Sequence, residues 1–184
     1  MDKPVTWKHP ESELMPNSLK ECGVELVGYP GNEKNPVTRY CTTFKVYSGE
    51  EEIPTYGGKA IVVDQGNPTY AEFAALSLFR QCGWQGFWYD SYRRKKRSGL
   101  HEESDGTDSV NDLLNMIASI TGSRTGVFDL VLWKDETIFF IELKRRARDR
   151  IRDTQIDWLQ AALSHGLDLK SFAILQWELE ASND

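Results

Sequence analysis

The stretch of sequence that decides the fold reads GVFDLVLW over residues 126–133, KDET over residues 134–137 and IFFIELK over residues 138–144. The outer segments are rich in β-branched and aromatic residues, which favour strands, and the polar segment between them carries the turn signal. The pattern therefore predicts an antiparallel hairpin. Counting outward from the two middle residues of the turn places Asp129 directly across from Glu142.

This pairing brings the carboxylates of Asp129 and Glu142 close together. Directly opposed residues of an antiparallel pair have Cβ atoms about 4.5–5.5 Å apart. Two carboxylates at that distance repel unless a positive charge lies between them. A divalent cation with oxygen ligands supplies such a charge, and Lys144 projects its ammonium from the same strand face as Glu142. The hairpin alone therefore predicts a cation site flanked by a lysine.

The arrangement of an aspartate, twelve intervening residues and then Glu-x-Lys resembles the core of the PD-(D/E)XK nucleases. The continuation QIDWL at residues 155–159 is similar to the VRR-NUC branch, whose pattern is Gly-x-x-Asp, Glu-x-Lys and Gln-x-x-Trp-Leu. The resemblance covers about residues 69–178. It departs from the family at Phe128, where a proline is usual; that proline shapes the backbone and carries no chemistry. The Glu-x-Lys tripeptide alone is also typical of a solvated strand face.

The resemblance implies a restriction-endonuclease-like fold and a metal-dependent nuclease that hydrolyses phosphodiester bonds in DNA. Asp129, Glu142 and the main-chain carbonyl of Leu143 would hold the metal. Mg²⁺ or Mn²⁺ is expected rather than zinc, because each of these ligands is a hard oxygen. Lys144 would position and help to deprotonate the attacking water, or neutralise the charge that builds on the phosphate.

The resemblance adds two catalytic side chains to this set, Glu72 and Gln155. In the family an acidic residue on the first core helix completes the metal site, and Glu72 is the one acid in the helix expected over residues 69–82. A second interpretation makes Glu72 part of a capping box with Thr69. The family glutamine orients the substrate phosphate or the water, and Gln155 would do so here. The alternative is an ordinary surface glutamine at the edge of a helix stripe.

The charge of the chain is unevenly distributed. The 184 residues have a formal net charge of −6, which by itself does not favour a nucleic-acid partner. Basic runs nevertheless occupy residues 93–97 and 144–152, and attraction to phosphate is local because salt screens charges beyond about 8 Å. We expect both runs to contact DNA; a solvated loop and a solvated helix start are the alternative interpretations. The residues concerned are Arg93, Arg94, Lys95, Lys96, Arg97, Arg145, Arg146 and Arg148.

Proline marks the organisation of the chain, because all seven prolines precede residue 69. Such a segment cannot hold long helices, and it predicts strands at residues 38–47 and 59–63. Residues 1–68 are therefore expected to form a β-rich extension of unknown role. Residues 69–184 would form the nuclease domain, with an insertion at about residues 92–125.

Periodicity beyond residue 69 predicts an α/β fold. Once the insertion is removed, the order is α-β-β-β-α-β, which is the order of the nuclease core. We expect a central mixed sheet flanked by helices. The elements predicted besides the hairpin are helices at 69–82, 108–121 and 151–165 and strands at 86–91 and 172–177.

The sequence also bears on compartment and assembly. No N-terminal stretch qualifies as a signal peptide and no run of about 18 apolar residues could span a bilayer, so a cytoplasmic protein without a membrane partner is expected. Cys22, Cys41 and Cys82 are odd in number and widely spaced, which predicts reduced, structural thiols. Cleavage of both strands of a duplex would favour a homodimer, although the sequence shows no interface.

Two other classes of function compete with a nuclease. One is a non-catalytic nucleic-acid-binding module on the same fold, which is disfavoured because such a module has no need of Lys144. The other is an α/β interaction scaffold, which would bind neither metal nor DNA. The sequence does not distinguish endonuclease from exonuclease action. Nor does it choose among DNA repair, recombination and the processing of phage or mobile-element DNA.

Overall fold

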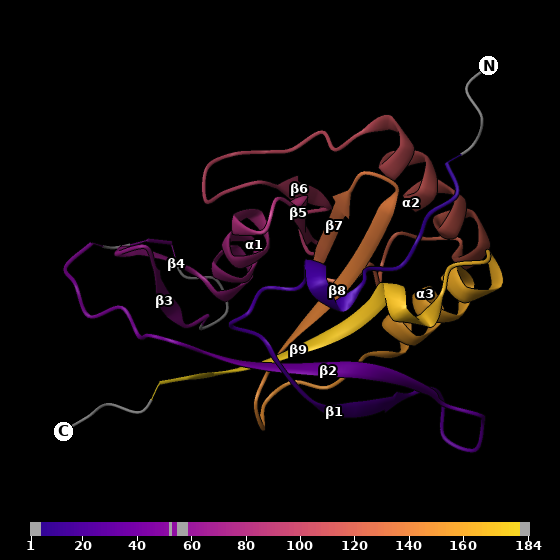
Figure 1. Cartoon of the computed structure of the whole chain (residues 1–184), viewed down its shortest axis with the longest axis horizontal. Helices are drawn as coiled ribbons and strands as arrows, with labels where there is room; N and C mark the ends of the chain where they lie inside the picture. The colour runs from indigo at the N-terminus through magenta and orange to yellow at the C-terminus, as the bar shows by residue number, and fades with distance from the viewer. Residues whose placement is uncertain (1–4, 52, 55–58, 181–184) are drawn as a thin grey trace.

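The computed structural model describes residues 5–51, 53–54 and 59–180. In that part of the chain a seven-stranded sheet has the order β1-β2-β9-β8-β7-β5-β6, and a separate two-stranded sheet pairs β3 with β4 (Figure 1). The strands are β1 (Lys20–Val27), β2 (Asn35–Phe44), β3 (Ile61–Asp64), β4 (Asn67–Tyr70), β5 (Gln85–Asp90), β6 (Lys95–Arg97), β7 (Leu130–Lys134), β8 (Thr137–Arg145) and β9 (Phe172–Leu179). The helices are α1 (Ala71–Gln81), α2 (Asp108–Thr121) and α3 (Asp153–Ser164), with short 3-10 helices at Ser12–Leu14 and Leu169–Ser171.

Helices cover both faces of the large sheet (Figure 1). Alternate side chains of a strand point to opposite faces, and β8 shows this directly. Phe140 belongs to the core that contains Trp158 of α3, whereas Phe139 belongs to the core that contains Phe79 of α1. The expected α/β fold, with a central mixed sheet flanked by helices, is confirmed. No helix in the described part of the chain is long and apolar enough to cross a membrane.

The hairpin of β7 and β8 has the register that the turn predicts. Leu130 pairs with Ile141 and Lys134 pairs with Thr137, so the turn is centred between residues 135 and 136. Asp129 lies one residue before β7 and faces Glu142 across the end of the hairpin. β9 runs parallel to both β8 and β2, whereas the other pairings in the large sheet are antiparallel.

The segment before residue 69 contributes strands to both sheets. β1 and β2 extend the large sheet, because β2 pairs with β9, and β3 and β4 form the small sheet near α1 (Figure 1). The strand expected at residues 38–47 is β2 and the one expected at 59–63 is β3, each shifted by two or three residues at its start. β1, β4 and β6 were not expected from the sequence. The division into an extension and a nuclease domain stays a prediction.

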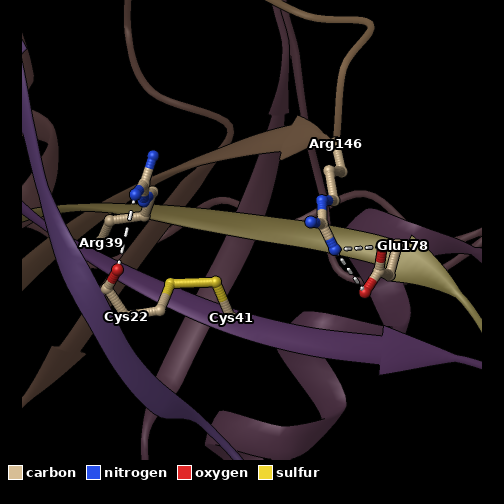
Figure 2. The surroundings of a disulfide bond; sticks show 5 residues. All are labelled: Cys22, Arg39, Cys41, Arg146 and Glu178. Atoms are coloured by element: carbon tan, nitrogen blue, oxygen red, sulfur yellow. Dashed lines mark hydrogen bonds and ion pairs between the residues drawn. A yellow bond between two sulfur atoms is a disulfide. The ribbon is translucent and has the colours of Figure 1, made fainter.

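The cysteines of the β1–β2 hairpin correct one expectation from the sequence. Cys22 and Cys41 form a disulfide with their Cα atoms 5.9 Å apart, and only Cys82 is free among the described residues (Figure 2). The prediction of reduced thiols is therefore wrong for Cys22 and Cys41. The reason lies in strand pairing, because Cys41 is opposite Lys20 and the irregular register between Glu21 and Gly23 brings Cys22 beside it.

Candidate active site

The predicted site residues of the β7–β8 hairpin line an open cleft of about 740 Å³. The cleft lies at the end of β8 and is bounded by the start of α1 and by the loop that leads to α3. Polar and charged side chains dominate its walls. The lining residues are Lys59, Ala60, Ala71, Glu72, Asp129, Glu142, Leu143, Lys144, Arg145, Arg148, Asp149, Arg150, Arg152 and Trp177.

Asp129 and Glu142 bridge the two strands where β7 begins. The backbone N–H of Asp129 donates to Oε2 of Glu142 at 3.3 Å, and the backbone N–H of Leu143 donates to Oδ2 of Asp129 at 2.9 Å. These bonds fix both carboxylates beside the last residues of the hairpin. The second oxygen of Glu142, Oε1, accepts from the ammonium of Lys144.

Lys144 and Gln155 complete a buried polar group next to the carboxylates. The Lys144 Nζ donates to Oε1 of Glu142 at 2.7 Å and to Oε1 of Gln155 at 3.3 Å. The same Gln155 oxygen accepts the backbone N–H of Arg152 at 3.0 Å, at the start of α3. Because its oxygen is held by two donors, the Gln155 amide has a fixed orientation. The surface-glutamine interpretation is wrong, since Gln155 is buried.

The glycine of the Gly-x-x-Asp pattern is required by close packing on α3. Gly126 has a φ of +98°, and a Cβ atom at this position would lie 1.9 Å from the carbonyl oxygen of Thr154. A side chain there would therefore push the start of α3, and Gln155 with it, away from the hairpin. Phe128 fills the position of the family's usual proline as a core residue: it is fully buried and packs edge-on against Phe172, with ring centroids 5.6 Å apart.

Glu72 reaches the cleft from the start of α1, and its partner there is Lys59. The capping-box interpretation is wrong, because Tyr70 is the N-cap of α1 and no side chain caps this end of the helix. Lys59 also lies over the ring of Trp88, 4.4 Å from its centroid. Lys59 could not be identified from the sequence, because no recognisable motif surrounds it and its partner is 13 residues away.

Burial and neighbouring carboxylates raise the pKa of Asp129. Burial raises the pKa of Asp129 well above its usual value of 3.8, and the neighbouring charges of Glu142 and Glu72 raise it further. The Leu143 N–H and the Lys144 ammonium act in the opposite direction and are outweighed. The ionised form of Asp129 is therefore unfavourable in this buried site, and a bound cation would stabilise it.

The residues of the cleft fit one oxygen-seeking metal ion. Asp129 and Glu142 offer hard carboxylate oxygens side by side, as such an ion prefers. Among the described residues, no group of three or more histidine, cysteine, aspartate or glutamate side chains is placed to hold a metal. Glu72 is paired with Lys59. The side chains therefore supply a two-carboxylate site, and further ligands would come from the main chain, substrate or water.

The basic residues expected to contact DNA are not all brought to the cleft. Arg145 and Arg148 line it, together with Arg150 and Arg152 of the same run. Arg146 lies outside the cleft, and its Nη1 contacts both carboxylate oxygens of Glu178 at 3.0 and 3.2 Å.

None of residues 93–97 lines the cleft, and most of them contact neighbouring parts of the chain. Arg93 forms an ion pair with the buried Asp90 at 3.0 Å, and Lys95 pairs with Glu103. Lys96 donates to the carbonyl oxygen of Asp105 at 2.8 Å. Arg97 donates to the carbonyl oxygen of Leu100.

The fold and the cleft define an α/β protein with a carboxylate pair, a buried lysine and an arginine-lined entrance. Residues 93–172 match the family model of the VRR-NUC domain. This match is to a PD-(D/E)XK nuclease-like family, and a VRR-NUC domain implies a nuclease-type function on DNA. The resemblance stated from the sequence is thus confirmed. The comparisons with curated proteins and with solved structures find no match.

The matched range contains the hairpin carboxylates, Lys144, Gln155 and both basic runs. Glu72, Lys59 and the β1–β2 hairpin lie outside it. Lys59 and the β1–β2 hairpin are therefore described from the geometry of this chain alone, whereas Glu72 was also expected from the resemblance.

Proposed function

We propose that this protein is a Mg²⁺- or Mn²⁺-dependent deoxyribonuclease that hydrolyses phosphodiester bonds. The observation that carries the proposal is the meeting of Asp129, Glu142 and Lys144 in an arginine-lined cleft. The order of α1, β5, β7, β8, α3 and β9 supports a restriction-endonuclease-like core, with β6 and α2 inserted between β5 and β7.

Asp129, Glu142 and the Leu143 carbonyl would hold the metal ion. When bound, the ion would polarise the scissile phosphate and lower the pKa of a coordinated water. The protein contributes a rigid frame for this, because the Leu143 N–H holds Asp129 and the Asp129 N–H holds Glu142. Neither carboxylate has to be reorganised before the reaction, which favours catalysis.

Lys144 and Gln155 act on the attacking water and the phosphate. The Lys144 ammonium is held by Glu142 and Gln155, so its position is set before substrate arrives. It orients the water and offsets the negative charge that develops on the phosphate. The amide nitrogen of Gln155 has no hydrogen-bond partner among the described residues, and it supplies a donor for a phosphate oxygen.

The arginines of the cleft bind the DNA backbone. Arg148, Arg150 and Arg152 are exposed and line the entrance, so their guanidinium groups can meet phosphates without leaving a buried partner. Phosphate contacts of this kind position a duplex and carry no sequence information. Sequence or structure preference must therefore come from other parts of the protein.

The proposal is tested with the purified full-length protein and labelled linear, flapped and four-way DNA. We expect cleavage with Mg²⁺ or Mn²⁺ and binding without cleavage in Ca²⁺, because Ca²⁺ takes longer bonds of about 2.3–2.6 Å and polarises water less. Asp129→Ala should remove the gain in affinity that Ca²⁺ gives. An affinity for DNA that no divalent ion changes, measured by gel shift against a chelator control, would remove the metal site from the proposal.

The alternative is a non-catalytic DNA-binding module on the same fold, and the same assay separates the two. Binding to all three substrates without cleavage in any metal would favour that module. The pathway of a catalytic protein, whether repair, recombination or the processing of phage or mobile-element DNA, would follow from the substrate that is cut fastest. A homodimer is expected only if both strands of a duplex are cut together, which sedimentation on DNA would test.

A further inference from the structure

A second hollow, of about 270 Å³, lies beside the cleft at the outer part of the sheet. We call it the hairpin hollow because the β1–β2 hairpin and its disulfide form one wall (Figure 2). Trp177 lines both the cleft and the hairpin hollow, so the two are neighbours. The lining residues are Cys22, Arg39, Cys41, Thr42, Arg146, Gln176, Trp177 and Glu178.

Arg39 is the residue of the hairpin hollow whose guanidinium group lacks hydrogen-bond acceptors. Its Nε is buried and has no hydrogen-bond partner among the described residues. Its Nη2 donates only a long bond, of 3.4 Å, to the carbonyl oxygen of Cys22. A guanidinium group that is partly withdrawn from water and left without an anion is unfavourable, because its donors lose hydration without gaining partners.

The rest of the hairpin hollow favours an anion with several oxygens. Arg39 and Arg146 flank the disulfide on its two sides (Figure 2). The single carboxylate among the lining residues is Glu178, which contacts Arg146 and leaves Arg39 without an acidic partner. Two guanidinium groups against one carboxylate give a net positive charge, and the planar donors of arginine match the oxygens of a phosphate.

The hairpin hollow continues the basic wall of the cleft. Arg145, on the cleft side, lies over the ring of Trp177 with its Cζ 5.4 Å from the ring centroid. The next residue, Arg146, donates its backbone N–H to the Trp177 carbonyl at 2.9 Å and directs its side chain to the hairpin hollow. Arg145 and Arg146 are consecutive residues at the end of β8. Arg145 therefore lines the cleft and Arg146 lines the hairpin hollow, on either side of Trp177.

We propose that the hairpin hollow binds a backbone phosphate of the same DNA whose scissile phosphate occupies the cleft. Arg39 is the principal contact, Arg146 is the second, and Glu178 limits the strength of binding. The inference rests on the proposed function, because it takes the ligand of the cleft to be DNA. It gives the β1–β2 hairpin, which lies outside the VRR-NUC match, a role in holding DNA beyond the point of cleavage.

The test measures DNA affinity in Ca²⁺ with the full-length protein, on duplexes of increasing length. Arg39→Met should weaken binding of long duplexes about tenfold at moderate salt and lower the salt slope by about one, the value for one lost phosphate contact. Affinity for the shortest duplex that fills the cleft should not change. Lys170→Met is the matched control, because Lys170 is an exposed cation and lines neither hollow.

Glu178→Gln keeps the inference testable if Arg39→Met fails to fold. Removing this carboxylate frees Arg146, so affinity for long duplexes should rise severalfold with a steeper salt slope. The rise in affinity should be smaller when Arg39→Met is also present, because Arg39 and Arg146 contact the same phosphate. A merely structural role for Glu178 would give no gain.

Unchanged affinity and salt slope in both variants would overturn the proposal. So would calorimetric binding of inorganic phosphate that Arg39→Met abolishes while DNA affinity stays the same, because the hollow would then be a site for the free anion. Failure of the proposed function is distinguished by a separate outcome. If no metal supports cleavage but the length-dependent effect of Arg39→Met persists, the phosphate site stands and the catalytic assignment falls.

Discussion

The two basic runs are alike in sequence and different in structure. Residues 93–97 contain five consecutive cations, and residues 144–152 contain six with a single acid. In the first run most side chains are occupied within the fold, as with Arg93 on Asp90 and Lys95 on Glu103. In the second run Arg148 and Arg150 line the cleft, and neither forms an ion pair among the described residues.

The difference shows that basic sequence and available positive charge are separate properties. Residues 93–97 form β6 and its approach, where Asp90 and residues 103–105 lie within reach of the cations. Residues 146–152 form a loop, and its one acid, Asp149, accepts the backbone N–H of Arg145 instead of pairing with an arginine. The second run therefore offers guanidinium groups to phosphate at the cleft, whereas Arg94, the exposed arginine of the first run, lies outside the cleft.

The largest expected effect concerns Lys144, the one cation of the second run that lies in the catalytic group. The double variant Glu142→Gln/Lys144→Met should lower the rate of cleavage on the order of 10²–10³-fold or more. Changing both residues avoids leaving one buried charge alone, which would cost about 3–5 kcal/mol of stability. The rate is measured with Mg²⁺ and labelled DNA, beside the thermal midpoint of unfolding.

Lys134→Met on the same hairpin is the matched control, since Lys134 donates to the Cys82 carbonyl, away from the cleft. It should cleave DNA at the wild-type rate. Wild-type cleavage by the Glu142/Lys144 variant would exclude this group from the reaction and leave the second run as a simple phosphate-binding strip.

Much of the cleft follows from local sequence. The hairpin register could be computed because a short turn fixes it, and this placed Asp129 opposite Glu142. Gln155 could be placed near β8 because helix periodicity puts it at the edge of an apolar stripe. Such features depend on a few neighbouring residues, so a single sequence contains the information.

Features that depend on distant segments were missed. Lys59 meets Trp88 and Glu72 only because the β3–β4 hairpin lies beside α1. Pairing between β2 and β9 places Cys41 opposite Gln176, and no local pattern predicts this parallel contact. The pairing of the first basic run was missed for a related reason, because the partners of Lys96 are set by the path of residues 103–111.

A second prediction compares the two runs directly through matched double variants. Arg148→Gln/Arg150→Gln should lower DNA affinity about tenfold and reduce the salt slope by about two, as expected for two lost phosphate contacts. Arg94→Gln/Lys95→Gln removes the same charge from exposed positions of the first run and should change neither quantity appreciably. Affinity is measured in Ca²⁺ at several salt concentrations.

Equal losses in the two double variants would show that affinity follows net charge rather than the location of the arginines. That result would end the distinction between the runs. A loss of affinity only in the first-run variant would show that DNA contacts the β5–β6 edge of the sheet and not the arginines of the second run.

A third prediction concerns Asp129, which lines the same cleft as the arginines of the second run. Burial and neighbouring carboxylates raise the pKa of Asp129 in the folded protein above its usual value of 3.8. A group with a raised pKa contributes stability that is fully present below its unfolded pKa and is lost as the pH rises through its folded pKa. At neutral pH, Asp129→Asn should therefore raise the midpoint of unfolding by a few degrees, at about 2–4 °C per kcal/mol for a chain of this size.

The comparison is made by thermal unfolding from pH 4 upward, without divalent ions. The wild type should lose stability relative to Asp129→Asn as the pH rises, and Ca²⁺ should restore it in the wild type alone. An Asn side chain can still accept the Leu143 N–H through its oxygen, so the structure is preserved. Parallel curves for the two proteins across this range would contradict the raised pKa of Asp129.

The smallest expected effect is that of the exposed pair between Lys95 and Glu103. Both side chains are largely exposed, and ion pairs of this kind contribute about 0.2–1 kcal/mol to stability. A double-mutant cycle of Lys95→Ala and Glu103→Ala should therefore give a coupling energy in that range, and Lys95→Ala should leave DNA affinity within error of the wild type. Glu103→Ala is the sharper half of the test, because it frees Lys95 without removing a cation. If pairing is what withholds the first run from DNA, Glu103→Ala should raise affinity slightly and steepen its salt dependence, whereas Lys95→Ala should do neither. A loss of affinity in Lys95→Ala as large as that in Arg148→Ala would show that the pair opens to DNA, and the two runs would then be equivalent.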